Sequence, residues 1–145
     1  MGEKEFRSLA QVASRLDFFA PIKGAELDRL LSHIQLFGYK NGETIFRRGD
    51  APDAFYIIHE GFVKIQLNQR RLWLIRKVAS LGPGNLFGEI ALLEDRPRSG
   101  TAVAAGPAQL FVVLKDDFNA LLRQNPALSD GLKWVAASRK FENSH

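Results

Sequence analysis

The sequence predicts a mainly β domain, an eight-stranded antiparallel, jelly-roll-like β-roll with helices at both ends of the chain. About eight short apolar runs between residues 36 and 115 are separated by Gly, Pro and Asn at short intervals. The clearest helical periodicity lies instead before and after these runs. Strands that follow one another in sequence, with helices grouped at the ends, are typical of a roll or barrel with helices outside it.

The composition indicates one globular domain. Of the 145 residues 46% are hydrophobic, and a chain of this length buries roughly 68–70% of its unfolded surface. The absence of cysteine excludes disulfides and thiolate metal sites. No apolar run approaches the ~20 residues of a membrane span, and no signal core is present, so a cytoplasmic location is expected. The net charge of +4 suits a solvated surface better than nucleic-acid binding.

The N-terminal part, residues 1–35, is expected to be helical. Apolar side chains recur at helical spacing over residues 3–16, and residues 17–21 end that helix. A second short helix follows Lys23-Gly24, with Leu27, Leu30 and Leu31 on one face. Both helices are expected to pack on the core.

Residues 36–115 are expected to form the β-roll. The apolar runs that predict its strands are residues 37–39, 45–46, 55–58, 62–67, 72–81, 101–104 and 110–114. The turn signals between them are Asn41-Gly42, residues 48–53, Glu60-Gly61, the polar hairpin 68–71, residues 82–85 and Gly106-Pro107. Each turn signal alone is weak evidence, because any roll needs such turns.

The C-terminal part, residues 116–145, is expected to form two helices. Either Asp116 or Asp117 is a candidate N-cap for the first helix. Asn125-Pro126 ends it, and the second helix runs from about residue 127 towards residue 141.

Residues 87–102 have the residue types of an anion site. Gly88 allows a close backbone approach, and Glu89 to Glu94 has the composition of one or two helical turns. A helix that starts after a glycine presents free N–H groups and the positive end of its dipole. Pro97 stops that helix, and Arg98 follows with a planar guanidinium suited to two oxygens of one phosphate. These groups together suit a sugar phosphate whose hydroxyl meets the acid.

The same segment closely resembles the phosphate-binding cassette of cyclic nucleotide-binding domains. That family includes the catabolite activator protein, the regulatory subunits of cAMP-dependent protein kinase and the cyclic-nucleotide-gated channels. Its pattern, Phe-Gly-Glu-aliphatic-Ala-Leu and then Arg, a small residue, Ala and often Thr, is matched by residues 87–92 and 98–101. Gly100 stands where Ala is usual, a change expected to be mild and to loosen the strand slightly. With the turn glycines, the resemblance covers roughly residues 17–123.

The resemblance implies a role for each residue of the cassette, residues 87–102. Arg98 is expected to bind the cyclic phosphate, and Glu89 to accept a hydrogen bond from the ribose 2′-hydroxyl. Gly88 would place its backbone near the ribose, and Ile90 and Ala91 belong to the helical turn whose backbone faces the phosphate.

Simpler readings of the two charged residues remain open at this point. Arg98 could be a surface arginine paired with Glu94 or Asp95. Glu89 could be an acid that only the helix dipole favours.

Four further residues are candidate ligand contacts. Ser99 can donate to a phosphate oxygen or a base edge, or be an ordinary strand serine. Because Thr at this place often accompanies cGMP use in the family, Ser99 favours cAMP without excluding cGMP. Thr101 either faces the pocket or pairs across the sheet. Trp134 on the last helix and Leu86 on the roll wall are candidates to cover the base, although Trp134 could instead pack on the core. The other candidates for this cover are Val78, Leu81, Leu132 and Val135.

Three functions are weighed for the single domain 1–145. The favoured one is a sensor that binds cAMP or cGMP as a ligand, without a cofactor, and moves its C-terminal helix. Its output would act on an effector domain or protein outside this chain, and a homodimer is compatible with it. An enzyme is not expected, because His33, His59 and His145 lack metal-ligand spacing. The alternative is a degenerate domain for docking or dimerisation, against which Glu89 and Arg98 argue. Without a helix-turn-helix after the last helix, direct DNA binding is not expected.

Overall fold

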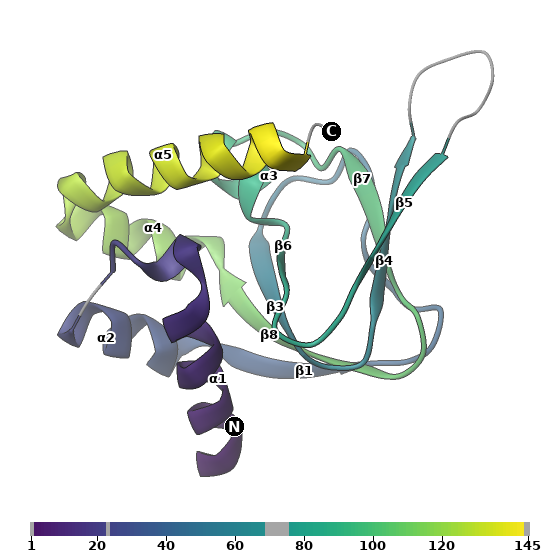
Figure 1. Cartoon of the computed structure of the whole chain (residues 1–145), viewed down its shortest axis with the longest axis horizontal. Coiled ribbons are helices and arrows are strands. Elements are labelled where there is room, and N and C mark those ends of the chain that lie inside the picture. Colours follow the sequence, from purple (N-terminus) through teal and green to yellow (C-terminus); the bar gives the residue numbers. More distant parts are fainter. Residues whose placement is uncertain (1, 23, 69–75, 144–145) are drawn as a thin grey trace.

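The strands form two antiparallel sheets that close into a roll, with the helices gathered on one side of it (Figure 1). The computed structural model describes residues 2–22, 24–68 and 76–143. In these residues one sheet has the order β1-β8-β3-β6 and the other the order β2-β7-β4-β5. The strands are β1 (Gln35–Tyr39), β2 (Thr44–Phe46), β3 (Ala54–Glu60), β4 (Val63–Asn68), β5 (Arg76–Leu81), β6 (Leu86–Phe87), β7 (Gly100–Ala104) and β8 (Ala108–Leu114). The predicted eight-stranded antiparallel roll is confirmed.

The helices come from both ends of the chain and from the cassette. They are α1 (Glu3–Arg15), the 3₁₀ turn η1 (Asp17–Phe19), α2 (Ala25–His33), α3 (Glu89–Glu94), α4 (Lys115–Gln124) and α5 (Pro126–Asn143). Helix α5 packs against α3, α4 and η1, which joins the cassette helix to the helical layer. No helix within the described ranges is long and apolar enough to cross a bilayer.

Strand β3 separates two apolar cores. Its residues 54–58 are all buried, because helices cover one face of its sheet and the second sheet covers the other. On the helix side Phe55 contacts Phe18 and Phe118, with ring centroids 5.2 Å apart in both pairs. On the roll side Tyr56 stacks on Phe87 at 5.1 Å. Successive residues of one strand therefore belong to different cores.

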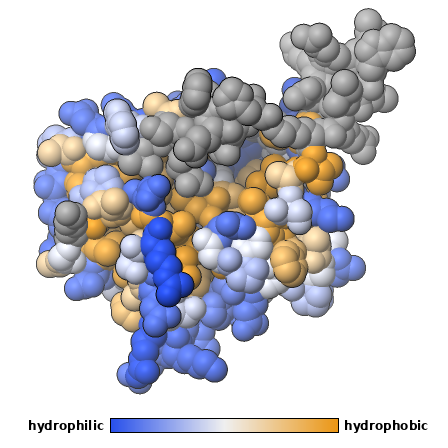
Figure 2. Space-filling model, viewed as in Figure 1, coloured by the Kyte–Doolittle hydropathy of each residue, from blue (hydrophilic) through white to orange (hydrophobic). Residues whose placement is uncertain are grey.

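The surface reflects this layering. In the view of Figure 1, apolar residues gather over the centre of the face and hydrophilic residues surround them (Figure 2). Large side chains that remain exposed include Phe62 and Trp134.

One local expectation needs correction, and two are confirmed with added detail. Asn41-Gly42 forms the predicted turn between β1 and β2, although β1 pairs with β8 and β2 pairs with β7. Neither Asp116 nor Asp117 caps α4, whose N-cap is Leu114, and both acids lie in its first turn, where the dipole favours them. Residues 17–19 end the first helix as predicted but form a 3₁₀ turn with two buried phenylalanines.

The predicted hairpin lies largely outside the described residues. Strands β4 and β5 pair antiparallel up to Asn68 and Arg76, in agreement with a hairpin connection. Residues 69–75, which include most of the predicted turn and the start of the returning run, are outside the described part of the chain.

Candidate functional site

Gly88 joins β6 to the cassette helix in a conformation that suits glycine. Its φ is +83°, in the left-handed region, and helix α3 begins directly after it at Glu89. A Cβ at this position would also lie 2.9 Å from Nη1 of Arg98. The residue therefore supplies both the turn and the space in which the arginine side chain lies.

The backbone of Arg98 is held between two segments. Its N–H donates to the carbonyl oxygen of Asp50 at 2.9 Å, and its own carbonyl accepts from the N–H of Gly49 at 2.8 Å. These bonds tie the end of the cassette turn to the turn that follows β2. These two hydrogen bonds therefore hold the main chain of Arg98 in place, and this sets the position from which its side chain extends.

The Arg98 side chain points into the roll and is only 1% exposed. Its Nη1 donates to the carbonyl oxygen of Gly88 at 2.6 Å, and its Nη2 donates to the carbonyl oxygen of Ala54. Its Cζ lies 4.2 Å from the centroid of the Phe46 ring, a cation–π contact. The guanidinium is thus a buried cation held by neutral groups.

The surface-arginine reading of Arg98 is wrong, because both of its suggested partners have other cations. Glu94 pairs with Arg96, and Asp95 pairs with Lys115 at 2.8 Å. Arg98 itself makes an ion-pair contact with Asp53, whose Oδ1 lies 3.9 Å from Nη2.

The charge of Arg98 is incompletely compensated in this position. Burial lowers the pKa of its guanidinium, while the phenol of Tyr56 once it is ionised, and the carboxylates of Asp53, Asp50 and Glu89, act in the opposite direction. A guanidinium still stays protonated in proteins. Within the described residues its Nε is buried and has no hydrogen-bond acceptor, although a buried donor without a partner costs about 1–3 kcal/mol.

The guanidinium of Arg98 lies against a cluster of three aromatic rings. Phe46, Tyr56 and Phe87 pack together with ring centroids 5.1–6.1 Å apart. Burial, with the nearby negative charge of Asp53, raises the pKa of Tyr56 to about 12, so its phenol is neutral at physiological pH. Sequence reasoning missed these rings and Asp53 as parts of the site. The alternation along residues 54–58 was the available signal, but it does not show which face holds the arginine.

Glu89 occupies the first position of α3 and is only 4% exposed. The helix dipole favours an acid there, and its negative charge acts on the Arg98 guanidinium, so both influences operate together. Gly88, Ile90 and Ala91 are half-buried around it. The structure therefore brings together the glycine, the acid and the arginine that the sequence singled out.

A model of the cyclic nucleotide-binding domain matches residues 37–125, which is more than half of the chain. The chain belongs to the cyclic nucleotide-binding domain family. The matched residues include the whole roll from Phe37 onward, the cassette and α4.

Individual relatives agree with this family. The cyclic AMP receptor protein of Thermus thermophilus is 37% identical over 118 residues, which are 81% of this chain and 54% of that protein. The crystal structure of the catabolite activator protein of Thermus thermophilus is 33% identical, has a TM-score of 0.72, and is matched over 89% of this chain and 60% of its own. The sensor domain of the transcriptional regulator DNR of Pseudomonas aeruginosa is 26% identical with a TM-score of 0.76, over 97% and 93%. The chain thus spans about half of the first relative.

The family cassette continues into β7, where successive residues face opposite sides of the sheet. Arg98, Gly100 and Ala102 are buried, whereas Ser99 is exposed. The Oγ1 of Thr101 accepts a hydrogen bond from the backbone N–H of Arg48 at 3.1 Å. This bond ties Thr101 to the turn that follows β2, and its backbone lies opposite Gln66 of β4; a contact with the ligand stays a prediction.

The family difference at Gly100 is not the mild change that the sequence predicts. A Cβ there would lie 2.7 Å from the carbonyl oxygen of Gln66 and 2.8 Å from Cδ2 of Leu67. The missing side chain instead allows β4 and β7 to approach closely.

The structure bears differently on the two predicted base contacts, Leu86 and Trp134. Leu86 packs in the helix-side core with Phe55, on the opposite face of the sheet from Arg98, so its expected place on the roll wall is wrong. Its neighbour Phe87 faces the roll. Trp134 is 73% exposed on α5, which excludes the reading that it packs on the core.

The other residues predicted to cover the base of the nucleotide also lie on different faces of the molecule. Val78 is half exposed and lies opposite Gln66 on the outer face, whereas Leu81 packs on the roll core and Leu132 in the helix-side core. The side chain of Val135 is outside the described part of the chain.

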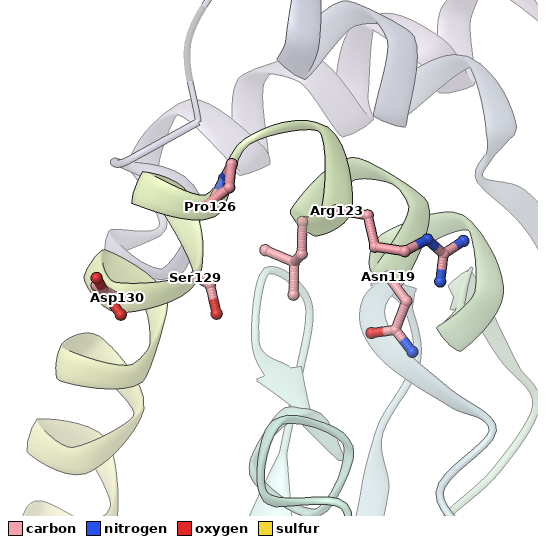
Figure 3. A pocket seen from close by; sticks show the side chains of 6 residues that line it. Asn119, Arg123, Pro126, Ser129 and Asp130 are labelled. Atoms are coloured by element: carbon pink, nitrogen blue, oxygen red, sulfur yellow. The ribbon is translucent and has the colours of Figure 1, made fainter.

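A hollow of about 470 Å³ lies between α4 and α5, away from the cassette (Figure 3). Its lining residues are Asn119, Leu122, Arg123, Pro126, Ser129 and Asp130. No cassette residue belongs to it. In the described ranges, no group of three or more His, Cys, Asp or Glu residues could hold a metal ion. His59 lies against the Phe111 ring, with Nδ1 3.4 Å from Oγ of Ser8.

Proposed function

We propose that the chain is a cyclic-nucleotide sensor module in which Arg98 binds the phosphate of the ligand. The observation that carries this proposal is the buried guanidinium inside the roll. Its ion-pair contact with the Asp53 carboxylate is as long as 3.9 Å, and its buried Nε has no acceptor among the described residues. A buried cation with so long an ion-pair contact and an unsatisfied donor is an unfavourable arrangement that an anionic ligand would relieve.

A cyclic nucleotide matches this requirement in charge and shape. Its phosphodiester carries one negative charge, and a guanidinium forms charge-assisted pairs of hydrogen bonds with such oxygens. On binding, the phosphate would replace neutral carbonyl acceptors, such as those of Gly88 and Ala54, as a partner of Arg98. Glu89, the buried first residue of α3, would accept a hydrogen bond from the ribose hydroxyl. The ligand would be released unchanged, with no cofactor involved.

We favour cAMP over cGMP as the ligand. A relative that is 37% identical is named a cyclic AMP receptor protein. Position 99 carries Ser rather than the Thr that often accompanies cGMP use. A titration with both nucleotides measures this preference directly.

The output of the module would be a shift of α5. Helix α5 packs against the cassette helix α3, so a ligand that moves α3 acts on it directly. Trp134 is exposed on α5 and would be available to cover the base in the bound state. The ligand shifts this equilibrium only by the difference between its affinities for the two arrangements. The moved helix would then act on an effector, or a second copy, outside this chain.

Calorimetric titration of the full chain with cAMP and with cGMP tests the proposal. Arg98→Gln should weaken binding by about 2–5 kcal/mol, the range for removing one partner of a buried charged pair. Arg96→Gln is the matched control, because Arg96 is also a cassette arginine but is exposed and paired with Glu94. Its affinity should equal that of the wild type.

The proposal is rejected if the wild type binds neither nucleotide, or if the Arg98 variant binds as tightly as the wild type. A folded protein without binding would leave the docking or dimerisation alternative.

A further inference from the structure

The cassette helix α3 ends at a residue with an unusual backbone conformation. Asp95 has φ +51° and ψ +51°, the one non-glycine residue with positive φ among the described residues. Asp and Asn tolerate this left-handed region better than other side chains do. The N–H of Asp95 points back to the carbonyls of Ala91 and Leu92, and the N–H of Arg96 bonds to Ala91 at 3.0 Å. The helix therefore has a defined C-terminal cap.

The side chain of this capping residue contacts the start of another helix. Oδ1 of Asp95 lies 2.8 Å from Nζ of Lys115, the first residue of α4. The Asp95 side chain is 78% exposed, whereas that of Lys115 is 30% exposed. The lysine is therefore partly enclosed, and its ammonium lowers the pKa of the Asp95 carboxyl.

Lys115 also touches the arginine site through its backbone. Its N–H donates to the carbonyl oxygen of Asp53 at 2.9 Å. The carboxylate of Asp53 lies 3.9 Å from Nη2 of Arg98, and the next residue, Ala54, accepts a hydrogen bond from the same nitrogen. One residue at the start of α4 thus contacts both the end of the cassette helix and the segment beside the arginine.

We propose that the Asp95–Lys115 ion pair couples the nucleotide site to the start of α4. A change in the position of α3 or of Arg98 reaches Lys115 by these two contacts, and α4 continues from Lys115 into α5. This inference rests on the proposed function and adds a route by which the ligand acts on the C-terminal helices. Exposed ion pairs stabilise proteins little, so the pair is assigned a coupling role rather than a stabilising one.

Amide hydrogen exchange of the ligand-free full chain tests the coupling without any nucleotide. Lys115→Met keeps the length of the side chain and removes its charge, and it should speed exchange at the amides of Asp95 and Arg96. Asp95→Asn keeps the tolerance for the left-handed region and should speed exchange at the amide of Lys115. Each effect is read on the opposite side of the contact, with an expected size of at least about 5-fold, the lower end of typical coupling.

Arg96→Met is the matched control, because it breaks the neighbouring pair with Glu94, which does not reach α4. It should leave exchange at Lys115 unchanged. The same measurements at saturating cAMP should show that both test variants reduce the ligand-induced change in α4 and α5, while Arg96→Met does not.

The coupling is overturned if neither test variant alters exchange across the contact, or if the control alters exchange at Lys115 equally. It is also overturned if the ligand-induced change in α4 and α5 is undiminished in both test variants. A wild type that binds no nucleotide would reject the proposed function alone, because the ligand-free comparison would still decide whether the ion pair couples the two segments.

Discussion

The two faces of the sheet β1-β8-β3-β6 have different chemistry although they share the same strands. The helix-facing side is mainly apolar, with phenylalanines from η1, β3 and α4 in mutual contact. The roll-facing side has an aromatic cluster too, but the charged guanidinium of Arg98 lies against it. One face therefore needs only close packing. The other face keeps a cation in a place where a cation is costly, which is typical of a binding site.

The largest expected effect on stability comes from the helix-facing side. Phe118→Ala removes a fully buried ring that contacts Phe18 and Phe55, and should lower the free energy of unfolding by about 3–5 kcal/mol. Denaturant unfolding of the purified chain measures this. Nucleotide affinity of the fraction that remains folded should change little, since Phe118 lies across the sheet from Arg98. A loss of affinity as large as that of Arg98→Gln would show that the two faces are not separate.

A smaller effect is expected where β4 and β7 approach closely. Gly100→Ala places a methyl group against the Gln66 carbonyl and Leu67, so it should destabilise the fold by about 1–3 kcal/mol. Gly38→Ala is the matched control, because Gly38 is also a strand glycine but has open space around it. The control should be neutral or slightly stabilising in thermal unfolding. Equal behaviour of the two variants would contradict the close approach.

The smallest effect is a change in stability at alkaline pH on the roll-facing side. The folded-state pKa of Tyr56 is raised from 10.0 to about 12 by burial, so the unfolded chain loses this proton first. Its contribution to stability is complete below pH 10 and disappears as the pH rises through about 12. Tyr56→Phe should flatten this part of the curve of unfolding free energy against pH. Curves that stay parallel over this range would argue that the phenol is not buried as described.

The local elements were predictable because their signals lie close together in the sequence. The glycine, the acid, the short helix and the arginine of the cassette fall within eleven positions, 88–98, and the structure brings them together. The strand runs of the roll were equally readable, since an apolar run between turn residues needs no knowledge of its partner. The exceptions are boundaries such as the start of α4, where Lys115 precedes the aspartates that were expected to cap it.

The residues whose positions the sequence predicted wrongly are those whose surroundings depend on strand pairing or on distant parts of the chain. Leu86 and Phe87 are adjacent and both buried, and only the register of β6 against β3 determines that Phe87 lies opposite Tyr56 and faces the roll. Gly100 became important only because β7 pairs with β4, which places it opposite Leu67. Trp134 could not be placed by helical periodicity, because the rest of the molecule leaves its side of α5 uncovered.

By itself the sequence determined the family, the roll and the glycine, the acid and the arginine of the candidate site, because each follows from residue types at short spacing. Tertiary structure decided which way those groups point. The guanidinium of Arg98 is enclosed by carbonyls of Gly88 and Ala54 and by the ring of Phe46, which come from separate segments of the chain. The physical reason is that a strand's side chains alternate between two faces, so the pairing of distant strands assigns each residue to the core, the site or the surface.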